Sequence, residues 1–399
     1  MIGFEAREKH PRWLNYAVPL ASVVLALIVG GIVLAATGHN PLTTYRQIVQ
    51  ASITQPGAFS STLVSMTPLL FTGLAAAVAF RMRVWNIGGE GQLYMGAVGA
   101  SAVGLLLHGL PGPVVILAMI AAGVMAGSLW ASIPGFLRAY LNTNEILTTL
   151  MLNYVAANIM YYLIFDSTSY WRDLTSPSAK VFPTGKTLPA SGTWPALQLS
   201  SLTIPFGLLL GVGLAVALWG MIRSTKYGFE MRVMADSPPA ARYAGMKTRR
   251  KILSLMALSG GIAGIGGASQ VGDFSHVLDP RGLEQPGFGY TGIVVAALGR
   301  YNPIAVVVTS FFIGMLVNAG FALQGPGFPT GLTGTLEGIL LFCVLGAEIF
   351  TRYRITVRLP HAAGRRAAGP PAAPPAGGQP AASDSPAAVV PAAPQGEVS

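Results

Sequence analysis

Residues 14–37 read LNYAVPLASVVLALIVGGIVLAAT and carry no charged side chain. A helix that crosses a bilayer needs about 20 consecutive apolar residues, because each residue advances it by about 1.5 Å. This run is therefore long enough to cross. The whole chain has the same character, since 52% of its residues are hydrophobic, 10% are charged and its mean hydropathy is +0.55. Such a composition excludes an ordinary soluble domain and indicates a protein that keeps most of its surface in lipid.

Apolar runs of similar length recur along the chain, at residues 63–80, 92–108, 114–137, 146–165, 202–222, 252–271, 304–323 and 332–350. A further run, residues 288–298, is too short to cross as a regular exposed helix. We expect it to be a broken helix shielded by its neighbours, because irregular backbone at membrane depth needs protein or a cavity around it. The sequence thus predicts an all-α integral membrane protein with about ten transmembrane helices, including one short broken helix.

Glycines spaced four residues apart lie within several of these runs. The pairs are Gly123 with Gly127, Gly207 with Gly211, Gly260 with Gly264, and Gly334 with Gly338. Small residues at this spacing let two membrane helices approach closely. We therefore expect close helix packing at these four places.

The formal net charge of +10 follows the membrane topology. With the N-terminus inside and ten crossings, 20 of the 25 lysines and arginines fall in inner segments. Cytoplasmic segments of membrane proteins carry such an excess of basic residues. Both termini are therefore predicted to be cytoplasmic, and the basic residues mark a membrane face and not a nucleic-acid site.

This topology divides the chain into regions. Residues 1–13 form a cytoplasmic N-terminus and residues 14–350 a membrane domain. Within that domain, residues 166–201 form an extracytoplasmic loop whose tryptophans and prolines suit an ordered cap. Residues 223–251 form the long cytoplasmic loop, and residues 351–399 form a cytoplasmic tail that we expect to be disordered from about residue 360, where it becomes rich in alanine and proline.

The sequence offers no set of residues for chemistry. The five histidines are scattered singly and Cys343 is the single cysteine, so we expect no metal and no cofactor. There is no G-x-x-x-x-G-K-[ST] loop for ATP, and no paired carboxylates or nucleophile with a base at usable spacing. We therefore expect a protein that is not itself an enzyme.

Polar residues interrupt the apolar pattern at residues 81–92, RMRVWNIGGEGQ. Asn86, Glu90 and Gln92 supply hydrogen-bonding groups beside a presumed cavity, and the glycines between them let the backbone bend. An alternative is that Glu90 pairs with Arg81 or Arg83 at the inner edge of the membrane.

Further polar groups lie within or beside the apolar runs. Asn153, Tyr94 and Tyr290 offer amide and hydroxyl partners for a neutral solute. An alternative for Asn153 is a hydrogen bond that holds two helices together. With the three residues of the preceding segment, they form the predicted substrate pathway.

The long inner loop contains a capped helix signal at residues 235–245, ADSPPAARYAG. Asp236 or Ser237 can cap a short helix, Pro238 suits its first turn, and Gly245 can end it. Ala235, Ala240 and Ala241 complete the predicted contact segment. A compact helix of this kind can insert into a groove on a partner, and the alternative is a solvated connector.

Two of these stretches, NIGGEGQ at 86–92 and ADSPPAARYAG at 235–245, resemble the permeases of sugar and nucleoside ABC importers. The stretches NEILTTLMLNY at 144–154 and GFGYTGIVVAALG at 287–299 look like the nucleoside branch of that family. The resemblance covers roughly residues 63–350. Sugar-type relatives show a different glycine-rich segment, with an aspartate and a serine, where this chain has residues 86–92.

The resemblance implies a multi-pass permease of the bacterial plasma membrane that translocates nucleosides. It implies that the helix at 235–245 docks on a separate ATPase, which hydrolyses the ATP. It also implies a second permease subunit, in a heterodimer, and an extracytoplasmic substrate-binding lipoprotein. The alternatives are a permease for a monosaccharide such as ribose and a self-sufficient secondary transporter, although no cluster for ion coupling is visible in the sequence.

Overall fold

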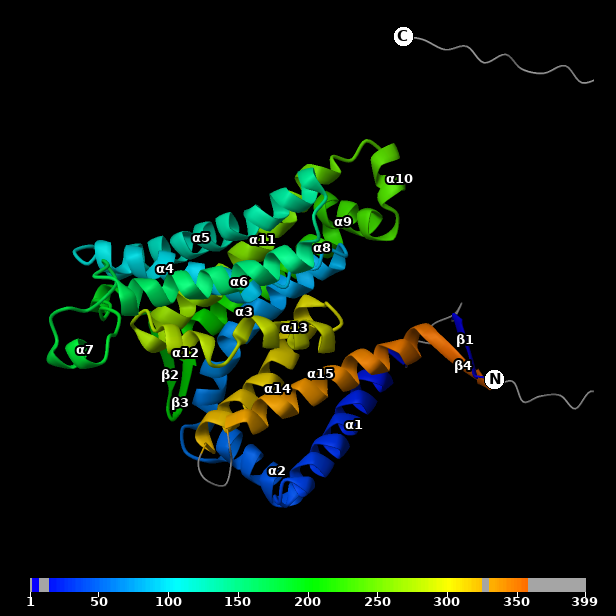
Figure 1. The fold of residues 1–399 in the computed structure, drawn as a ribbon, viewed down its shortest axis with the longest axis horizontal. Helices are drawn as coiled ribbons and strands as arrows, with labels where there is room; N and C mark the ends of the chain where they lie inside the picture. Colours follow the sequence, from blue (N-terminus) through cyan, green and yellow to red (C-terminus); the bar gives the residue numbers. More distant parts are fainter. Residues whose placement is uncertain (1, 7–13, 325–329, 358–399) are drawn as a thin grey trace, which may run out of the picture. The chain divides into compact units, whose positions relative to one another are not determined.

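The computed structural model describes residues 2–6, 14–324 and 330–357 of the chain. Most of these residues are helical (Figure 1). The described residues between 5 and 354 form one compact unit, which contains all of the described helices. Two short strands near the ends of the chain, β1 (Ile2–Ala6) and β4 (Tyr353–Val357), pair with each other. The predicted disorder of the tail beyond residue 360 lies outside the described residues.

The helices follow the predicted apolar runs closely, and each run lies largely within one helix. Their bounds are α1 (Leu14–Ala36), α2 (Pro41–Val49), α3 (Ala58–Arg81), α4 (Gly89–Leu106), α5 (Gly112–Leu141), α6 (Glu145–Tyr161), α7 (Pro177–Val181), α8 (Phe206–Ser224), α9 (Lys226–Asp236), α10 (Pro238–Tyr243), α11 (Thr248–Ser269), α12 (Pro280–Glu284), α13 (Phe288–Leu298), α14 (Pro303–Ala322) and α15 (Thr330–Arg352). Wider π-helical turns extend α2, α6 and α11 through Gln50–Thr54, Tyr162–Asp166 and Gln270–Ser275.

Six described helices are long and apolar enough to cross a membrane: α3, α5, α6 with its π-helical extension, α8, α11 with its extension, and α14. A seventh candidate consists of Leu20–Ala36 and Pro41–Thr54, which are bent by 117° relative to each other. The short run at 288–298 is a helix of 11 residues, α13. The chain is thus a mostly helical protein with six or seven candidate spans, and the count of about ten crossings stays a prediction.

The centre of the unit is the packing of α11 against α3, α4 and α5. Glycines bring α5 and α11 together: a Cβ added at Gly264 would lie 2.1 Å from the carbonyl oxygen of Gly123, and one at Gly127 would lie 2.2 Å from that of Gly260. Neither contact leaves room for a side chain. The predicted close packing is therefore confirmed for these two pairs.

The prediction of close packing was wrong for α15. No described atom lies within 4 Å of a Cβ built at Gly334 or Gly338. The spacing of small residues identifies a face that can pack closely, but a neighbouring helix must also be present on that side.

The helices differ in how much of their surface they bury. In α3, 89% of the apolar stretch is buried, whereas in α6 and its extension only 22% is buried. Leu117, Met125 and Leu129 of α5 and Met151 of α6 are large apolar side chains that remain exposed. An apolar surface of this extent indicates contact with lipid or with another membrane protein.

The two long loops lie at opposite ends of the helical unit (Figure 1). One end carries α9 and α10. The other carries α7 and an antiparallel hairpin of β2 (Ala196–Leu199) and β3 (Leu202–Pro205), in which Ala196 faces Pro205 and Leu199 faces Leu202. Which end faces the cytoplasm stays a prediction from the distribution of basic residues.

The hairpin is an exception to the predicted all-α fold. The expected span at 202–222 included β3, but α8 begins only at Phe206. Pro205 is the N-cap residue of α8. Its ring fixes φ and it has no backbone N–H, so a helix can begin after it but does not continue through it from β3. The apolar residues before it, Leu202 and Ile204, therefore continue the run in composition but not in helical structure.

We expect Gly264→Val to destabilise the protein, because the new side chain would overlap the backbone of α5. Overpacking of this kind costs on the order of 1–3 kcal/mol. Gly213→Val in α8 is the matched control, because nothing lies within 4 Å of a Cβ at that position. Thermal unfolding in detergent, followed by size-exclusion chromatography, should give a lower midpoint for Gly264→Val alone. Equal midpoints for the two variants would contradict the close α5–α11 contact.

Candidate functional site

Asn86 and Gln92 bind each other across the start of α4. The Asn86 Nδ2 donates to Gln92 Oε1 at 3.0 Å, and the Gln92 Nε2 donates to Asn86 Oδ1 at 2.9 Å. Asn86 Nδ2 also donates to Ser259 Oγ of α11 at 2.9 Å, and Ser259 Oγ donates to the carbonyl of Ala75 in α3 at 2.8 Å. All of these side chains are buried. The amide pair therefore holds the connection between α3 and α4, and the Ser259 hydroxyl attaches this connection to α11.

Glu90 joins α4 to the start of α13. Its carboxylate accepts a hydrogen bond from the Tyr94 hydroxyl at 2.5 Å, and it accepts from the backbone N–H groups of Gly289 and Tyr290. A carboxylate is favourable at the N-terminus of a helix, where unpaired N–H groups carry partial positive charge. Arg81 instead donates from Nε to the Tyr301 carbonyl at 2.9 Å. The alternative pairing of Glu90 with Arg81 is therefore wrong.

Asn153 of α6 bridges the same region from the other side. Its Oδ1 accepts from the Gly91 N–H at 2.9 Å, and its Nδ2 donates to the Ile87 carbonyl at 2.9 Å and to the Tyr290 hydroxyl at 3.2 Å. Thr149, one turn earlier, accepts from the Ile87 N–H at 3.3 Å. The alternative interpretation of Asn153, a bond between helices, agrees with this geometry.

The six predicted pathway residues therefore come together around the start of α4, which we call the α4 cluster: Asn86, Glu90, Gln92, Tyr94, Asn153 and Tyr290. The first five are buried and their polar groups bind one another or nearby backbone. Tyr290 alone is exposed, with 39% of its surface accessible. Paired groups stabilise the cluster, and Tyr290 is the member that can meet a solute.

Three members of this network were not predicted: Ser259, Thr149 and Gly289. Gly289 is required because a Cβ there would lie 2.1 Å from the Glu90 nitrogen. Thr149 lies one helical turn from Asn153, so the spacing carried a signal. Nothing in the sequence distinguishes Ser259 from other serines in the apolar runs.

The predicted short helix in the inner loop is α10. Ser237 is its N-cap residue, and the Ser237 Oγ accepts from the Ala240 N–H at 3.3 Å. Pro238 occupies the first turn, and the chain leaves the helix through Gly245, whose φ of +74° suits glycine. The predicted capping is therefore confirmed, with Ser237 and not Asp236 as the cap.

The predicted contact residues divide into two groups by burial. Asp236, Pro238, Ala240 and Gly245 are exposed, whereas Ala235 and Ala241 are buried, the latter completely. Ala235 of α9 and Ala241 of α10 therefore pack against their own chain. The outward surface instead presents Tyr243, which is 99% exposed. The sequence does not distinguish these directions, because alanines carry no polar or charged signal.

The helix before it, α9, was not predicted. It is attached to α11 by an ion pair between Glu230 and Lys251, and the Tyr227 hydroxyl lies 3.1 Å from Ser254 Oγ. The ammonium group of Lys251 also lies 3.8 Å from the centre of the Tyr227 ring. The hydrogen bond from Lys251 holds the pKa of the Glu230 carboxyl below its usual value. These contacts join α9 to the start of α11.

Comparison with known proteins identifies the class of protein that carries these features. A family model described as "Branched-chain amino acid transport system / permease component" matches residues 58–345. A glucose ABC transporter permease of Haloferax volcanii is 30% identical, over 89% of this chain and 94% of its own. A guanosine ABC transporter permease of Bacillus subtilis is 32% identical, over 76% and 85% of the two chains. A nucleoside ABC transporter permease of Lactococcus lactis is 27% identical, over 88% and 94%.

The matched region runs from the first residue of α3 into α15, so it contains the α4 cluster, α9, α10 and the central helix α11. It is most of the described chain, and it covers both of the segments that carry polar residues. This chain is a member of that family of transport permeases.

Proposed function

We propose that the chain is the membrane-spanning subunit of an ABC importer whose cargo is a nucleoside. The observation that carries the proposal is α10, a capped helix that presents an exposed tyrosine at one end of a bundle of membrane helices. The sequence has no ATP-binding loop of its own, so the energy must come from a separate ATPase. We infer that α10 docks on that ATPase.

The remaining features of the proposal follow the resemblance and the family. An extracytoplasmic substrate-binding lipoprotein delivers the solute, and a second permease subunit completes the pathway. The chain lies in the bacterial plasma membrane with about ten crossings and with both termini in the cytoplasm. The apolar outer faces of α5 and α6 then contact lipid or the second permease.

In the proposed mechanism, a movement of α10 is transmitted to the substrate pathway at the α4 cluster. Because Glu230 and Lys251 attach α9 to α11, a push on α10 shifts the first turns of α11. Ser259, further along α11, holds Asn86, so the shift continues into the α4 cluster. The α4 cluster carries Tyr290, its exposed member, and a change in its position alters the wall that faces the solute.

A neutral cargo agrees with the groups in this region. The α4 cluster offers amides and hydroxyls, and its one carboxylate, Glu90, is already bound by Tyr94 and by backbone N–H groups. A strongly charged solute would therefore lose its hydration without compensation. Two of the three relatives described above are named for nucleosides or guanosine, which supports a nucleoside. The relative named for glucose makes a monosaccharide the second candidate.

Competition for uptake separates these two cargoes. In cells that carry the complete importer, unlabelled adenosine should compete with radiolabelled guanosine, whereas glucose, ribose and leucine should compete weakly. The reason is that the base supplies contacts that a sugar lacks. If glucose or leucine competed as well as adenosine, the nucleoside assignment would fail while the permease assignment would survive.

Removal of the exposed tyrosine of α10 tests the docking surface. Tyr243→Ala should reduce uptake about tenfold and weaken co-purification of the ATPase, because truncation of an aromatic residue at the centre of an interface can cost about 2 kcal/mol or more. Tyr162→Ala is the matched control, since Tyr162 is also exposed and lies beyond α6. Normal uptake by Tyr243→Ala, at normal abundance in the membrane, would refute the docking assignment.

Two substitutions distinguish a residue that stabilises the α4 cluster, Asn153, from the residue proposed to contact the solute, Tyr290. Asn153→Ala leaves the Gly91 N–H and the Ile87 carbonyl without their partner, at a cost of about 1–3 kcal/mol for each buried group. It should lower both the unfolding midpoint and the uptake rate. Tyr290→Phe keeps the ring and should slow uptake with little change in the midpoint. A variant Tyr290→Phe that transports normally would remove Tyr290 from the pathway.

A further inference from the structure

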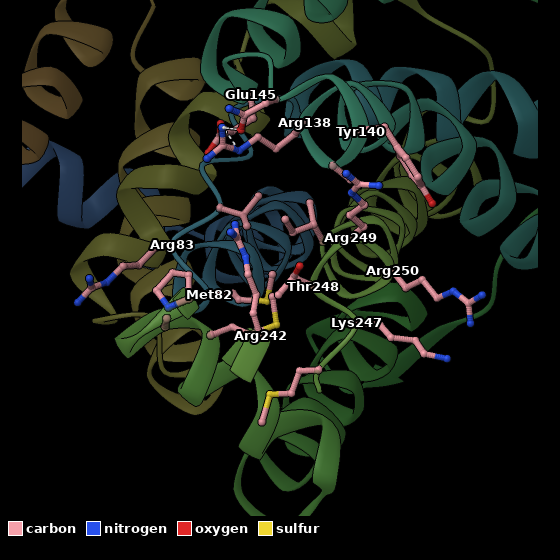
Figure 2. Close-up of a pocket in the computed structure, with 18 residues that line it drawn as sticks. Met82, Arg83, Arg138, Tyr140, Glu145, Arg242, Lys247, Thr248, Arg249 and Arg250 are labelled. Carbon is pink, nitrogen blue, oxygen red and sulfur yellow. Dashed lines mark hydrogen bonds and ion pairs between the residues drawn. The ribbon is translucent and has the colours of Figure 1, made fainter. Parts of the chain in front are cut away.

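A cavity of about 890 Å³ lies behind α10, where the candidate spans α3 and α5 end and α6 and α11 begin. Its walls are the connection after α3, the turn from α5 to α6, the start of α11, and the α9–α10 segment (Figure 2). None of the α4 cluster lines it. It is therefore a site separate from the residues discussed above, although it shares Ala235 and Pro238 with the α10 region.

The lining of this cavity is strongly basic. It contains six basic side chains and one carboxylate, and the basic residues are Arg83, Arg138, Arg242, Lys247, Arg249 and Arg250. The carboxylate, Glu145, lies 3.2 Å from Arg138 Nε and so neutralises one of them. The guanidinium of Arg249 lies 5.5 Å from the centre of the Tyr140 ring, which is a favourable but neutral partner. The lining thus holds more positive charge than its own side chains compensate.

Backbone groups add to the positive electrostatic potential of the cavity. The helix α11 begins at Thr248 on the cavity wall, and the side chain of its N-cap residue, Lys247, makes no capping hydrogen bond. The first turn of a helix presents unpaired N–H groups and the positive end of the helix dipole. In Figure 2, Arg242 extends toward the middle of the cavity and Arg138 with Glu145 lies on the opposite side, whereas Arg83, Lys247 and Arg250 extend away from the middle. Arg242 of α10 and Arg249 of α11 therefore line one space beside a helix N-terminus.

We propose that this cavity binds a phosphate-bearing anion, either the headgroup of an anionic lipid or a soluble phosphate compound. Five of the six basic side chains are arginines, whose planar forks match phosphate oxygens with two hydrogen bonds at once. Basic pockets between membrane helices on the cytoplasmic side are suited to lipid phosphates. The candidate spans α3 and α5 end and α11 begins beside this cavity, and the ends of spans are where a bilayer would have its headgroups.

The bound anion would link α10 to the membrane helices. Arg242 belongs to α10 and Arg249 to α11, so a phosphate group bound by both would join two elements whose positive side chains otherwise repel. Occupancy then holds α10 in place, and an empty cavity leaves like charges facing one another across it. The site is thus a regulator of the position of α10 that acts whether or not an ATPase is present.

Binding to the purified full chain in a neutral detergent tests the site. The two probes are short-chain phosphatidylglycerol and inorganic pyrophosphate, with short-chain phosphatidylcholine as the zwitterionic reference. Calorimetric titration gives the dissociation constant, and the unfolding midpoint gives an independent measure, since a ligand of the folded state raises it. The double variant Arg242→Gln with Arg249→Gln should bind at least about tenfold more weakly, because two charge-assisted contacts are lost.

Arg223→Gln with Lys226→Gln is the matched control, because it removes the same charge near the same end of the unit but from outside the cavity. It should retain the affinity of the natural chain. If the double variant does not fold, Arg242→Gln alone replaces it, because Arg242 is exposed.

The two probes distinguish the sources of the phosphate. Binding of phosphatidylglycerol alone assigns a lipid headgroup, binding of pyrophosphate alone assigns a soluble anion, and binding of both assigns the shared phosphate chemistry. Equal weakening in the cavity variant and the control variant would overturn the proposal, since it would show a general attraction of the basic face. Absence of binding by the natural chain to either probe would overturn it as well.

Discussion

The backbone contact between α5 and α11 is the constraint on which the other features depend. In lipid, helices gain no hydrophobic energy by leaving the solvent, so close van der Waals contact must hold them together. The glycines of both helices allow that contact. The position of α11 then fixes three separate regions: Lys251 near its start holds α9, Ser259 in its middle holds Asn86, and Gly272 beyond its end accepts a hydrogen bond from the backbone of Trp194.

The α4 cluster solves a second problem, which is how to keep polar groups inside an apolar bundle. An unpaired amide or carboxylate there would cost several kcal/mol, whereas paired groups are strengthened by the low dielectric. Asn86 with Gln92, and Glu90 with the start of α13, meet this condition. Such a cluster resists separation of its parts. Of its six residues, only Tyr290 is exposed, so the proposed contact with a solute falls on Tyr290.

Much of this fold could be predicted from the sequence, because the signals for helices and caps lie within a few neighbouring residues. A run of apolar residues predicts a helix from neighbouring residues alone. A cap such as Ser237 before two prolines likewise predicts a helix start within about one turn. The partners of polar groups could not be predicted, because Asn153 and Gly91 lie 62 residues apart and Glu90 and Gly289 lie 199 apart. The hairpin of β2 and β3, the helix α9 and the inward direction of Ala241 were missed for the same reason. Each depends on tertiary packing that an apolar pattern does not encode.

The short helix α10 shows why its surroundings matter as much as its own sequence. A helix of six residues is not stable by itself in water, because nucleation costs more than one turn of hydrogen bonds returns. Its orientation must come from the groups behind it: Ala241 in the packed interface, α9 held by Lys251, and the arginines around the cavity. The first two are fixed by the fold, whereas the charges are balanced only in part by Glu145. The proposed anion would balance these charges, so the support that the cavity gives to α10 would depend on whether the anion is bound.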